Sequence, residues 1–443
     1  MPQIGAGMPS SQMTLKRHFI KRLTSQMDLS AVKMPMILSL LNQVVSSGGN
    51  FLIGVYLART LSLADFGLYG ISYGICQLYI GVGNAILLMQ MMVNMPDKQD
   101  ADKDAYASRI LLGVLMLGGL TLFLVVSGTQ ALIFLQPDWQ RFSGMITAIS
   151  LTAVAFLAKD FFISYAYIRR RETLALSVSM LSLAILCAGL LSEYLAGIPL
   201  SAQNVLMLYA LADALAAAYG YWSSPLGILR NRRNLMPDFI EAWVHGRWAL
   251  GGVTATWMQA QTYTYVLAFF LGPVGVGQAN AARIFISPFN FLIPAINQIA
   301  IPRLADLRQS NRRKMLRVSL MITAGLFLLA IVYSGLLLGS LDFVFSTILG
   351  RHDEGILVFV PIWCAFLITH MSLTGGVGLL QVMRRFRALT LFNIPGTVVA
   401  IVSAIVLIQR YGATGAIWGM VAGEVMLTLL IWREIRNVHK EKN

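Results

Sequence analysis

A stripe of polar side chains interrupts the otherwise apolar segment "NAARIFISPFNFLIPAIN" at residues 280–297. Its members recur every three or four residues, which places them on one helix face; they are Asn280, Arg283, Ser287, Asn290, Pro294 and Asn297. A charged side chain inside a long apolar helix normally faces protein or water. A guanidinium also binds phosphate and carboxylate groups well. Arg283 therefore either lines the path of an anionic cargo or forms a structural ion pair.

Other apolar segments carry polar residues of the same kind. The uncharged ones include Asn50, Gln77 and Gln259, and the charged ones are Lys159, Asp160, Asp213 and Glu424. The carboxylates would either carry a coupling ion, H⁺ or Na⁺, or balance the charges of Arg283 and Lys159. Single Asn and Ser residues also have the alternative role of holding membrane helices together. His370 is either a packed, hydrogen-bonded residue or a proton relay.

The elements that must position these residues are membrane-spanning helices. The chain has 443 residues, of which 57% are hydrophobic and 12% charged, and continuous apolar runs long enough to cross a bilayer recur along it. We expect an all-α integral membrane protein with about twelve spans, at residues 36–57, 68–93, 110–135, 144–168, 174–192, 204–224, 248–271, 278–301, 317–340, 355–380, 389–409 and 413–432.

The positive charges indicate the orientation of these spans. If the N-terminus is cytoplasmic, only Arg59, Arg141, Arg351 and Arg410 lie in loops on the opposite side, which predicts that both termini are cytoplasmic. The net charge of +14 then reflects topology and contact with anionic membrane lipids, and we expect no nucleic-acid partner. The expected organisation is a basic N-terminal segment over 1–34, six-helix bundles over 35–225 and 246–433, a cytoplasmic linker over 226–245 and a tail over 434–443.

The two bundles look like repeats of each other. A shift of 210 residues places "YLARTLSLADFGLY" (56–69) on "VLAFFLGPVGVGQA" (266–279) and matches Gly67 with Gly277. The same shift matches Trp222 with Trp432, while Asp213 and Glu424 are one residue away from it. Parallel repeats of this kind commonly hold cargo between the halves and expose it alternately to either side.

Several functional classes lack support in the sequence. It contains no Walker loop, dinucleotide-binding fingerprint, nucleophile elbow or zinc-helix motif. The three cysteines are scattered over separate spans and predict neither a disulfide framework nor a metal site. We therefore expect no cofactor and no enzymatic activity.

The segment "GVYLARTLSLADFGLYGISYGI" (54–75) resembles the signature around the first two helices of Wzx-type polysaccharide flippases. Their superfamily also contains multidrug and toxin extruders and lipid II flippases. The resemblance implies a V-shaped fold of two six-helix bundles in the bacterial inner membrane. It also implies movement of undecaprenyl-pyrophosphate-linked oligosaccharide from the inner to the outer leaflet, for cell-surface polysaccharide synthesis beside a polymerase and chain-length complex.

On this resemblance, Arg283 and Lys159 would contact pyrophosphate or an acidic sugar, and the carboxylates of Asp160, Asp213 and Glu424 would balance or couple that charge. The asparagine, glutamine and serine side chains would bind sugar hydroxyls. One alternative is a multidrug extruder driven by protons or cations, whose cavity should be dominated by acidic and aromatic residues. A second is a membrane enzyme acting on polyprenyl-linked sugar, which would need catalytic loops that the sequence does not show.

Overall fold

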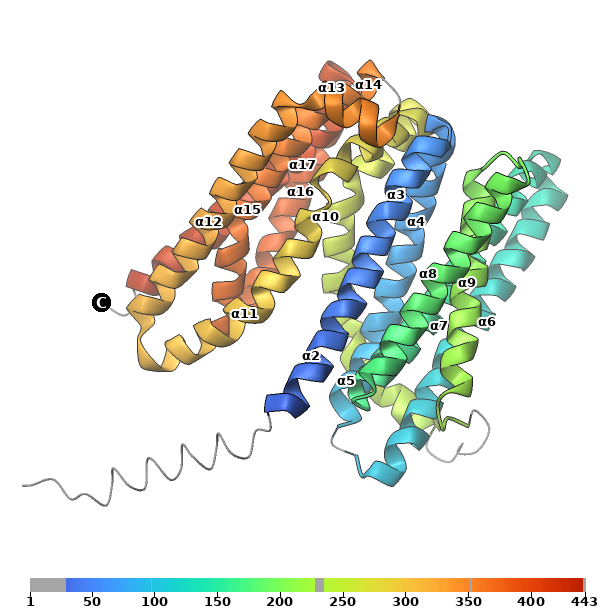
Figure 1. The fold of residues 1–443 in the computed structure, drawn as a ribbon, viewed down its shortest axis with the longest axis horizontal. Coiled ribbons are helices and arrows are strands. Elements are labelled where there is room, and N and C mark those ends of the chain that lie inside the picture. Colours follow the sequence, from blue (N-terminus) through green and yellow to red (C-terminus); the bar gives the residue numbers. More distant parts are fainter. Residues whose placement is uncertain (1–28, 97, 228–234, 351–352, 441–443) are drawn as a thin grey trace, which may run out of the picture.

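The computed structural model describes residues 29–96, 98–227, 235–350 and 353–440, and nearly all of this part is helical, with no strand (Figure 1). Its first half consists of six helical rods that follow one another along the chain. Three of the elements in these rods, η1, η2 and η3, are short π or 3₁₀ segments. The elements are α2 (Leu29–Gln43), η1 (Val44–Gly48), α3 (Gly49–Thr60), α4 (Leu63–Gly83), η2 (Asn84–Leu88), α5 (Met89–Asn94), α6 (Asp100–Leu135), η3 (Pro137–Trp139), α7 (Gln140–Ile168), α8 (Glu172–Leu195) and α9 (Ala202–Trp222).

The second half repeats this plan. Its elements are α10 (Leu235–Arg283), η4 (Ile284–Ile286), α11 (Phe289–Ser310), α12 (Arg312–Gly339), α13 (Leu341–Val344), η5 (Phe345–Leu349), α14 (Glu354–Leu357), α15 (Val360–Val382), α16 (Phe386–Tyr411) and α17 (Ala413–Lys440). The predicted fold of two six-helix bundles is confirmed. Helix α10 begins at Leu235, inside the segment expected to be the linker.

Helix α10 contains two arms joined by a sharp break. Gly272 has φ 72° and ψ −170°, a conformation that glycine adopts readily, and Pro273 starts the second arm. The corresponding turn of the first half lies at Leu61 and Ser62, where the Ser62 side chain accepts a hydrogen bond from the Asp65 amide and caps α4. The two matched sequence segments thus form equivalent turns between the first two rods of each half.

Ten helices in the described part of the chain are long and apolar enough to cross a membrane. They include neither the α2–α3 rod nor α11. These two rods carry the polar stretches "NQVVSSGGN" (42–50) and "NFLIPAIN" (290–297), which lower their hydropathy. Both of these rods carry a residue of the predicted site, Asn50 in α3 and Asn290 in α11.

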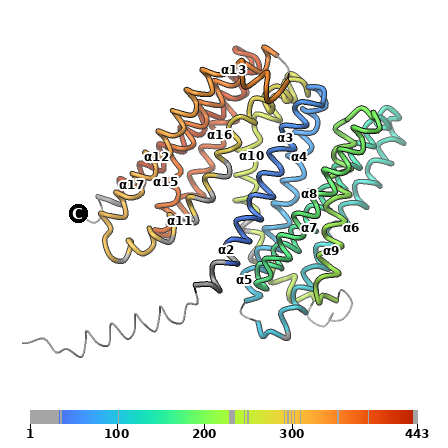
Figure 2. The backbone as a smooth tube through the Cα atoms, viewed as in Figure 1, coloured from blue at the N-terminus to red at the C-terminus, as the bar shows by residue number. Residues whose placement is uncertain are grey.

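The two bundles form a V (Figure 1). They meet at the end where α3 contacts η5, which lies between α13 and α14, and they diverge toward the end where α2 begins (Figure 2). The first arm of α10 runs between them: Trp257 Nε1 donates to the Gly74 carbonyl of the first half at 2.9 Å, and Gln259 Nε2 donates to Glu424 of the second half at 3.2 Å.

The halves approach most closely at the closed end of the V, where α4 crosses the second arm of α10. A Cβ atom added to Gly67 would lie 1.8 Å from the Pro273 carbonyl oxygen, and one added to Gly277 would lie 2.0 Å from that of Leu63. Both pairs follow the 210-residue shift, so this crossing is symmetric between the halves. It requires glycine at both positions because there is no room for a side chain.

Candidate functional site

A cavity of about 310 Å³ lies between the two halves, below the glycine crossing. We call it the central cavity. The first half contributes mainly aromatic residues and the second mainly polar ones; the lining residues are Asn50, Phe66, Tyr69, Gly70, Tyr73, Tyr209, Gln261, Tyr263, Asn280, Arg283, Ile284 and Ser287. Four residues of the predicted site are therefore brought together here: Asn50, Asn280, Arg283 and Ser287.

Two buried aromatic side chains hold Arg283 at the wall of the central cavity. Its guanidinium carbon lies 5.5 Å from the centre of the Tyr263 ring and 5.4 Å from that of Trp363, within the range of a cation–π contact. Tyr263 is 1% exposed and Trp363 0%. Within the described residues, no ion pair involves Arg283. Aromatic faces orient the guanidinium without neutralising its charge.

A chain of hydrogen bonds completes the support of Arg283. Its Nη1 donates to the Tyr263 hydroxyl at 2.9 Å, and that hydroxyl donates to Asn280 Oδ1 at 2.6 Å. The Ser287 hydroxyl donates to the backbone carbonyl of Arg283 at 3.3 Å. This bond gives the Arg283 carbonyl a partner within the same segment. Asn280 thus positions Arg283 through Tyr263 in addition to lining the cavity.

The opposite wall consists of three tyrosines, Tyr69, Tyr73 and Tyr209, which we call the tyrosine wall. Their ring centres lie 5.7 to 6.3 Å apart. Tyrosine combines an apolar ring face with a polar hydroxyl, which suits a ligand such as a sugar that has both kinds of surface. Tyr73 is the equivalent of Arg283 under the 210-residue shift. At this equivalent position the first half therefore presents an aromatic side chain to the cavity and the second half a cationic one.

A smaller cavity of about 160 Å³ adjoins the central one and shares Asn50, Tyr73 and Tyr209 with it. We call it the side cavity. Gln77, Lys159 and Asp160 line it, so three further residues of the predicted site lie here.

Lys159 in the side cavity is paired with a buried carboxylate. Its Nζ lies 2.8 Å from Asp213 Oδ1, and the Ser182 hydroxyl donates to the same carboxylate. The side chain of Asp213 is fully buried, and that of Lys159 is 20% exposed. Asp213 therefore forms an ion pair with Lys159, and its role in coupling stays a prediction.

Glu424 lies in the second half and makes two side-chain contacts. One carboxylate oxygen contacts His370 Nδ1, and the other accepts from Gln259 Nε2 at 3.2 Å. Gln259 thus binds a carboxylate and is not among the residues that line these two cavities. The side chain of the remaining predicted residue, Asn290, lies outside the part of the chain whose side chains the structure describes.

Sequence reasoning did not name Trp363, Tyr263 or the three tyrosines of the tyrosine wall as site residues. Trp363 lies in an apolar run, and nothing in its spacing links it to Arg283, 80 positions earlier. Tyr69 and Tyr73 are four residues apart and so lie on one face of α4. That spacing does not separate a cavity wall from ordinary helix packing.

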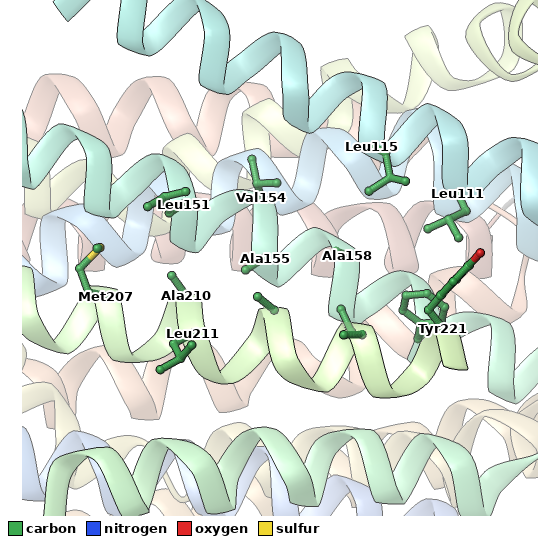
Figure 3. Close-up of a pocket in the computed structure, with 14 residues that line it drawn as sticks. Leu111, Leu115, Leu151, Val154, Ala155, Ala158, Met207, Ala210, Leu211 and Tyr221 are labelled. Carbon is green, nitrogen blue, oxygen red and sulfur yellow. The ribbon is translucent and has the colours of Figure 1, made fainter. Parts of the chain in front are cut away.

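A larger groove, of about 530 Å³, has a different character (Figure 3). It lies among α6, α7 and α9 and is lined by leucine, alanine, valine, phenylalanine and methionine side chains together with Tyr221. In a membrane, such a surface suits lipid hydrocarbon and offers no partner for a charged group. The central cavity is therefore the candidate site. In the described part of the chain, no group of three or more His, Cys, Asp or Glu residues could hold a metal ion.

Comparisons with known proteins find the same fold among solved structures. No protein-family model matches the sequence, and no curated protein is significantly similar to it. Among solved structures, an inward-facing multidrug resistance MATE family transporter of the MOP superfamily is similar over 92% of this chain and 99% of its own, with a TM-score of 0.69 and 13% identity. The outward-facing conformation of such a transporter has a TM-score of 0.59, at 13% identity over 92% of this chain and 95% of its own.

The lipid II flippase MurJ in an inward closed conformation is similar over 91% of this chain and 87% of its own, with a TM-score of 0.70 and 12% identity. At this level of identity the likeness concerns the fold. The chain has the fold shared by MATE family transporters and the lipid II flippase MurJ.

Proposed function

We propose that the chain is a flippase that moves an undecaprenyl-pyrophosphate-linked oligosaccharide from the inner to the outer leaflet of a bacterial inner membrane by alternating access. In this role it would serve cell-surface polysaccharide synthesis and work beside a polymerase and chain-length complex. Neighbours that include a lipid II flippase and MATE transporters support the general class of exporter.

The observation that carries the proposal is the charge of Arg283, which no ion pair among the described residues compensates. The guanidinium faces a cavity between the halves, with aromatic rings and a hydroxyl as neighbours. An unneutralised cation at membrane depth is costly, and a pyrophosphate would satisfy its remaining donors through charge-assisted hydrogen bonds. The tyrosine wall and Asn50 would then face the sugar. Lys159 contributes less to the cargo because Asp213 already neutralises it.

The alternative is a multidrug extruder that takes cationic drugs. It would need a free carboxylate in the central cavity. Asp213 and Glu424 contact Lys159 and His370 instead, and Asp160 lines the side cavity. The charge of the central cavity therefore favours an anionic cargo. The paired carboxylates remain candidates for coupling to H⁺ or Na⁺.

The test uses purified protein in vesicles with a fluorescent short-chain polyprenyl-pyrophosphate oligosaccharide. We expect unchanged glycan to reach the far leaflet, Arg283→Ala to abolish that movement and Arg283→Lys to retain part of it, because lysine keeps the charge but loses the planar fork. The control is Arg410→Ala, which removes an exposed cation at the end of α16. Normal movement by Arg283→Ala would refute the anion site. Chemical conversion of the glycan would identify an enzyme, and cation-driven drug efflux without glycan movement would identify the extruder.

A further inference from the structure

The two halves carry a pair between a basic and an acidic side chain at equivalent places. In the first half Lys159 of α7 contacts Asp213 of α9, and in the second half His370 of α15 contacts Glu424 of α17. A shift of 211 residues places Lys159 on His370 and also Asp213 on Glu424. Both pairs join the fourth and sixth rods of their halves, so they are structural equivalents that differ in chemistry.

The basic partner is what differs. Lysine stays protonated throughout the physiological range, whereas histidine changes its charge near neutral pH. The basic groups of the two pairs are therefore of residue types that change charge in different pH ranges. Glu424 is buried, with 6% of its side chain exposed, and His370 is 36% exposed. Of the two side chains, the imidazole is therefore the more accessible one.

A row of aromatic rings connects His370 to the candidate cargo site. Trp363, Phe366 and His370 follow one another at helical spacing on one face of α15, with ring centres 5.5 Å and 5.7 Å apart. Trp363 is also the ring against which Arg283 rests. A displacement of α15 at His370 would therefore be transmitted directly to the support of Arg283.

The charged groups around α15 are few in the described part of the chain. Glu424 of α17 contacts His370 itself, and Arg283 contacts Trp363, about 10 Å away along the helix. Arg308 of α11 donates to the Val382 carbonyl at the end of α15. From α12, the side chains that meet α15 at Gly375 are the uncharged Ser319 and Thr323. Glu424 is therefore the charged group positioned to hold a proton on His370.

We propose that His370 and Glu424 form a proton-binding site that makes the second half of the transporter, and not the first, responsive to pH. When His370 is protonated, the pair is an imidazolium whose Nδ1–H faces Glu424 Oε1. Loss of the Nε2 proton to water leaves a neutral imidazole that still donates through Nδ1. The buried Glu424 carboxylate then has no positive charge beside it among the described residues, which weakens the contact between α15 and α17. The effect of pH on transport rests on the proposed transport function. Proton binding by the pair does not depend on that function.

The first experiment needs no cargo. Histidine labelled with ¹⁵N is followed by NMR across pH in nanodiscs, where the chain has five histidines and His370→Lys identifies the signal of interest. We expect that signal to change with pH, and we expect Glu424→Gln to alter its pH response, because the carboxylate contacts the imidazole. A His370 signal that does not titrate, or that is insensitive to Glu424→Gln, would overturn the proposal.

The second experiment exchanges the chemistry of the halves and measures glycan movement. Wild-type movement should change by roughly tenfold over about two pH units. His370→Lys, which copies the first-half pair into the second half, should flatten the profile, and Lys159→His should add a second titration. If His370→Lys does not fold, the double variant His370→Gln/Glu424→Gln replaces it, with the same expectation. Retention of the wild-type pH profile by the folded variant would refute the proposal. Titration of His370 by NMR without any glycan movement would refute the proposed cargo and leave the proton site standing.

Discussion

The Arg283 guanidinium donates to the Tyr263 hydroxyl at 2.9 Å, and the single proton of that hydroxyl is directed to Asn280 Oδ1 at 2.6 Å. A guanidinium has five donor hydrogens, so this contact fixes its orientation and leaves most donors for a ligand. Tyr263 is therefore a positioning residue: it sets the direction in which Arg283 presents its charge.

Tyr263→Phe tests this role because it removes the hydroxyl and keeps the ring beneath Arg283. A hydrogen bond to a charged group contributes about 1.5–3 kcal/mol, so we expect affinity for a short-chain polyprenyl pyrophosphate to fall by roughly tenfold or more. Titration calorimetry of the purified protein measures the change. Tyr265→Phe is the matched control, because the buried Tyr265 hydroxyl has no hydrogen-bond partner in the described structure. Equal losses in both variants would contradict a positioning role.

The buried pair in the first half predicts a stability effect. Lys159→Ala would leave the carboxylate of Asp213 buried with Ser182 as its neighbour. Breaking a buried pair on one side costs about 3–5 kcal/mol, so the midpoint of thermal unfolding should fall clearly. By contrast Arg283→Ala, which orphans no carboxylate among the described residues, should unfold near the wild-type temperature.

Two further variants separate pairing from general damage. Lys159→Ala/Asp213→Ala should recover most of the lost stability, because no charge is then left unpaired. Lys103→Ala breaks an ion pair of similar length, 2.8 Å, whose partner Asp100 is 85% exposed, and it should change unfolding little. A double variant less stable than Lys159→Ala would show that the pair does not explain the effect.

Much of the fold could be predicted because the sequence carries periodic signals. Apolar runs locate the rods, and the 210-residue shift locates the equivalent turns at Leu61 and Gly272. The three- and four-residue spacing of Asn280, Arg283 and Ser287 placed them on one face, and all three line the central cavity. Such signals are local or repeat along the chain, so one sequence is enough to read them.

Contacts between distant helices could not be predicted in the same way. The partner of Arg283 depends on how α15 packs against α10, and periodicity does not specify which aromatic residue arrives there. The pairing of His370 with Glu424 had a faint signal, since both members are 211 residues beyond Lys159 and Asp213. The sequence alone does not specify which carboxylate pairs with Lys159. The 211-residue spacing therefore predicts the second pair only once the contact between Lys159 and Asp213 is known.

The glycine crossing at the closed end of the V allows a prediction about how the halves are joined. Gly67→Ala and Gly277→Ala would each place a methyl group about 2 Å from a backbone carbonyl oxygen of the other half, so the helices must separate. We expect each to lower stability by about 1–3 kcal/mol in thermal unfolding. Gly54→Ala is the control, because a Cβ there meets nothing within 4 Å and alanine favours a helix by up to about 1 kcal/mol. Since both substitutions force open the same contact, the double variant should lose less than the sum of the two losses; strict additivity would mean that the two glycines lie in independent contacts.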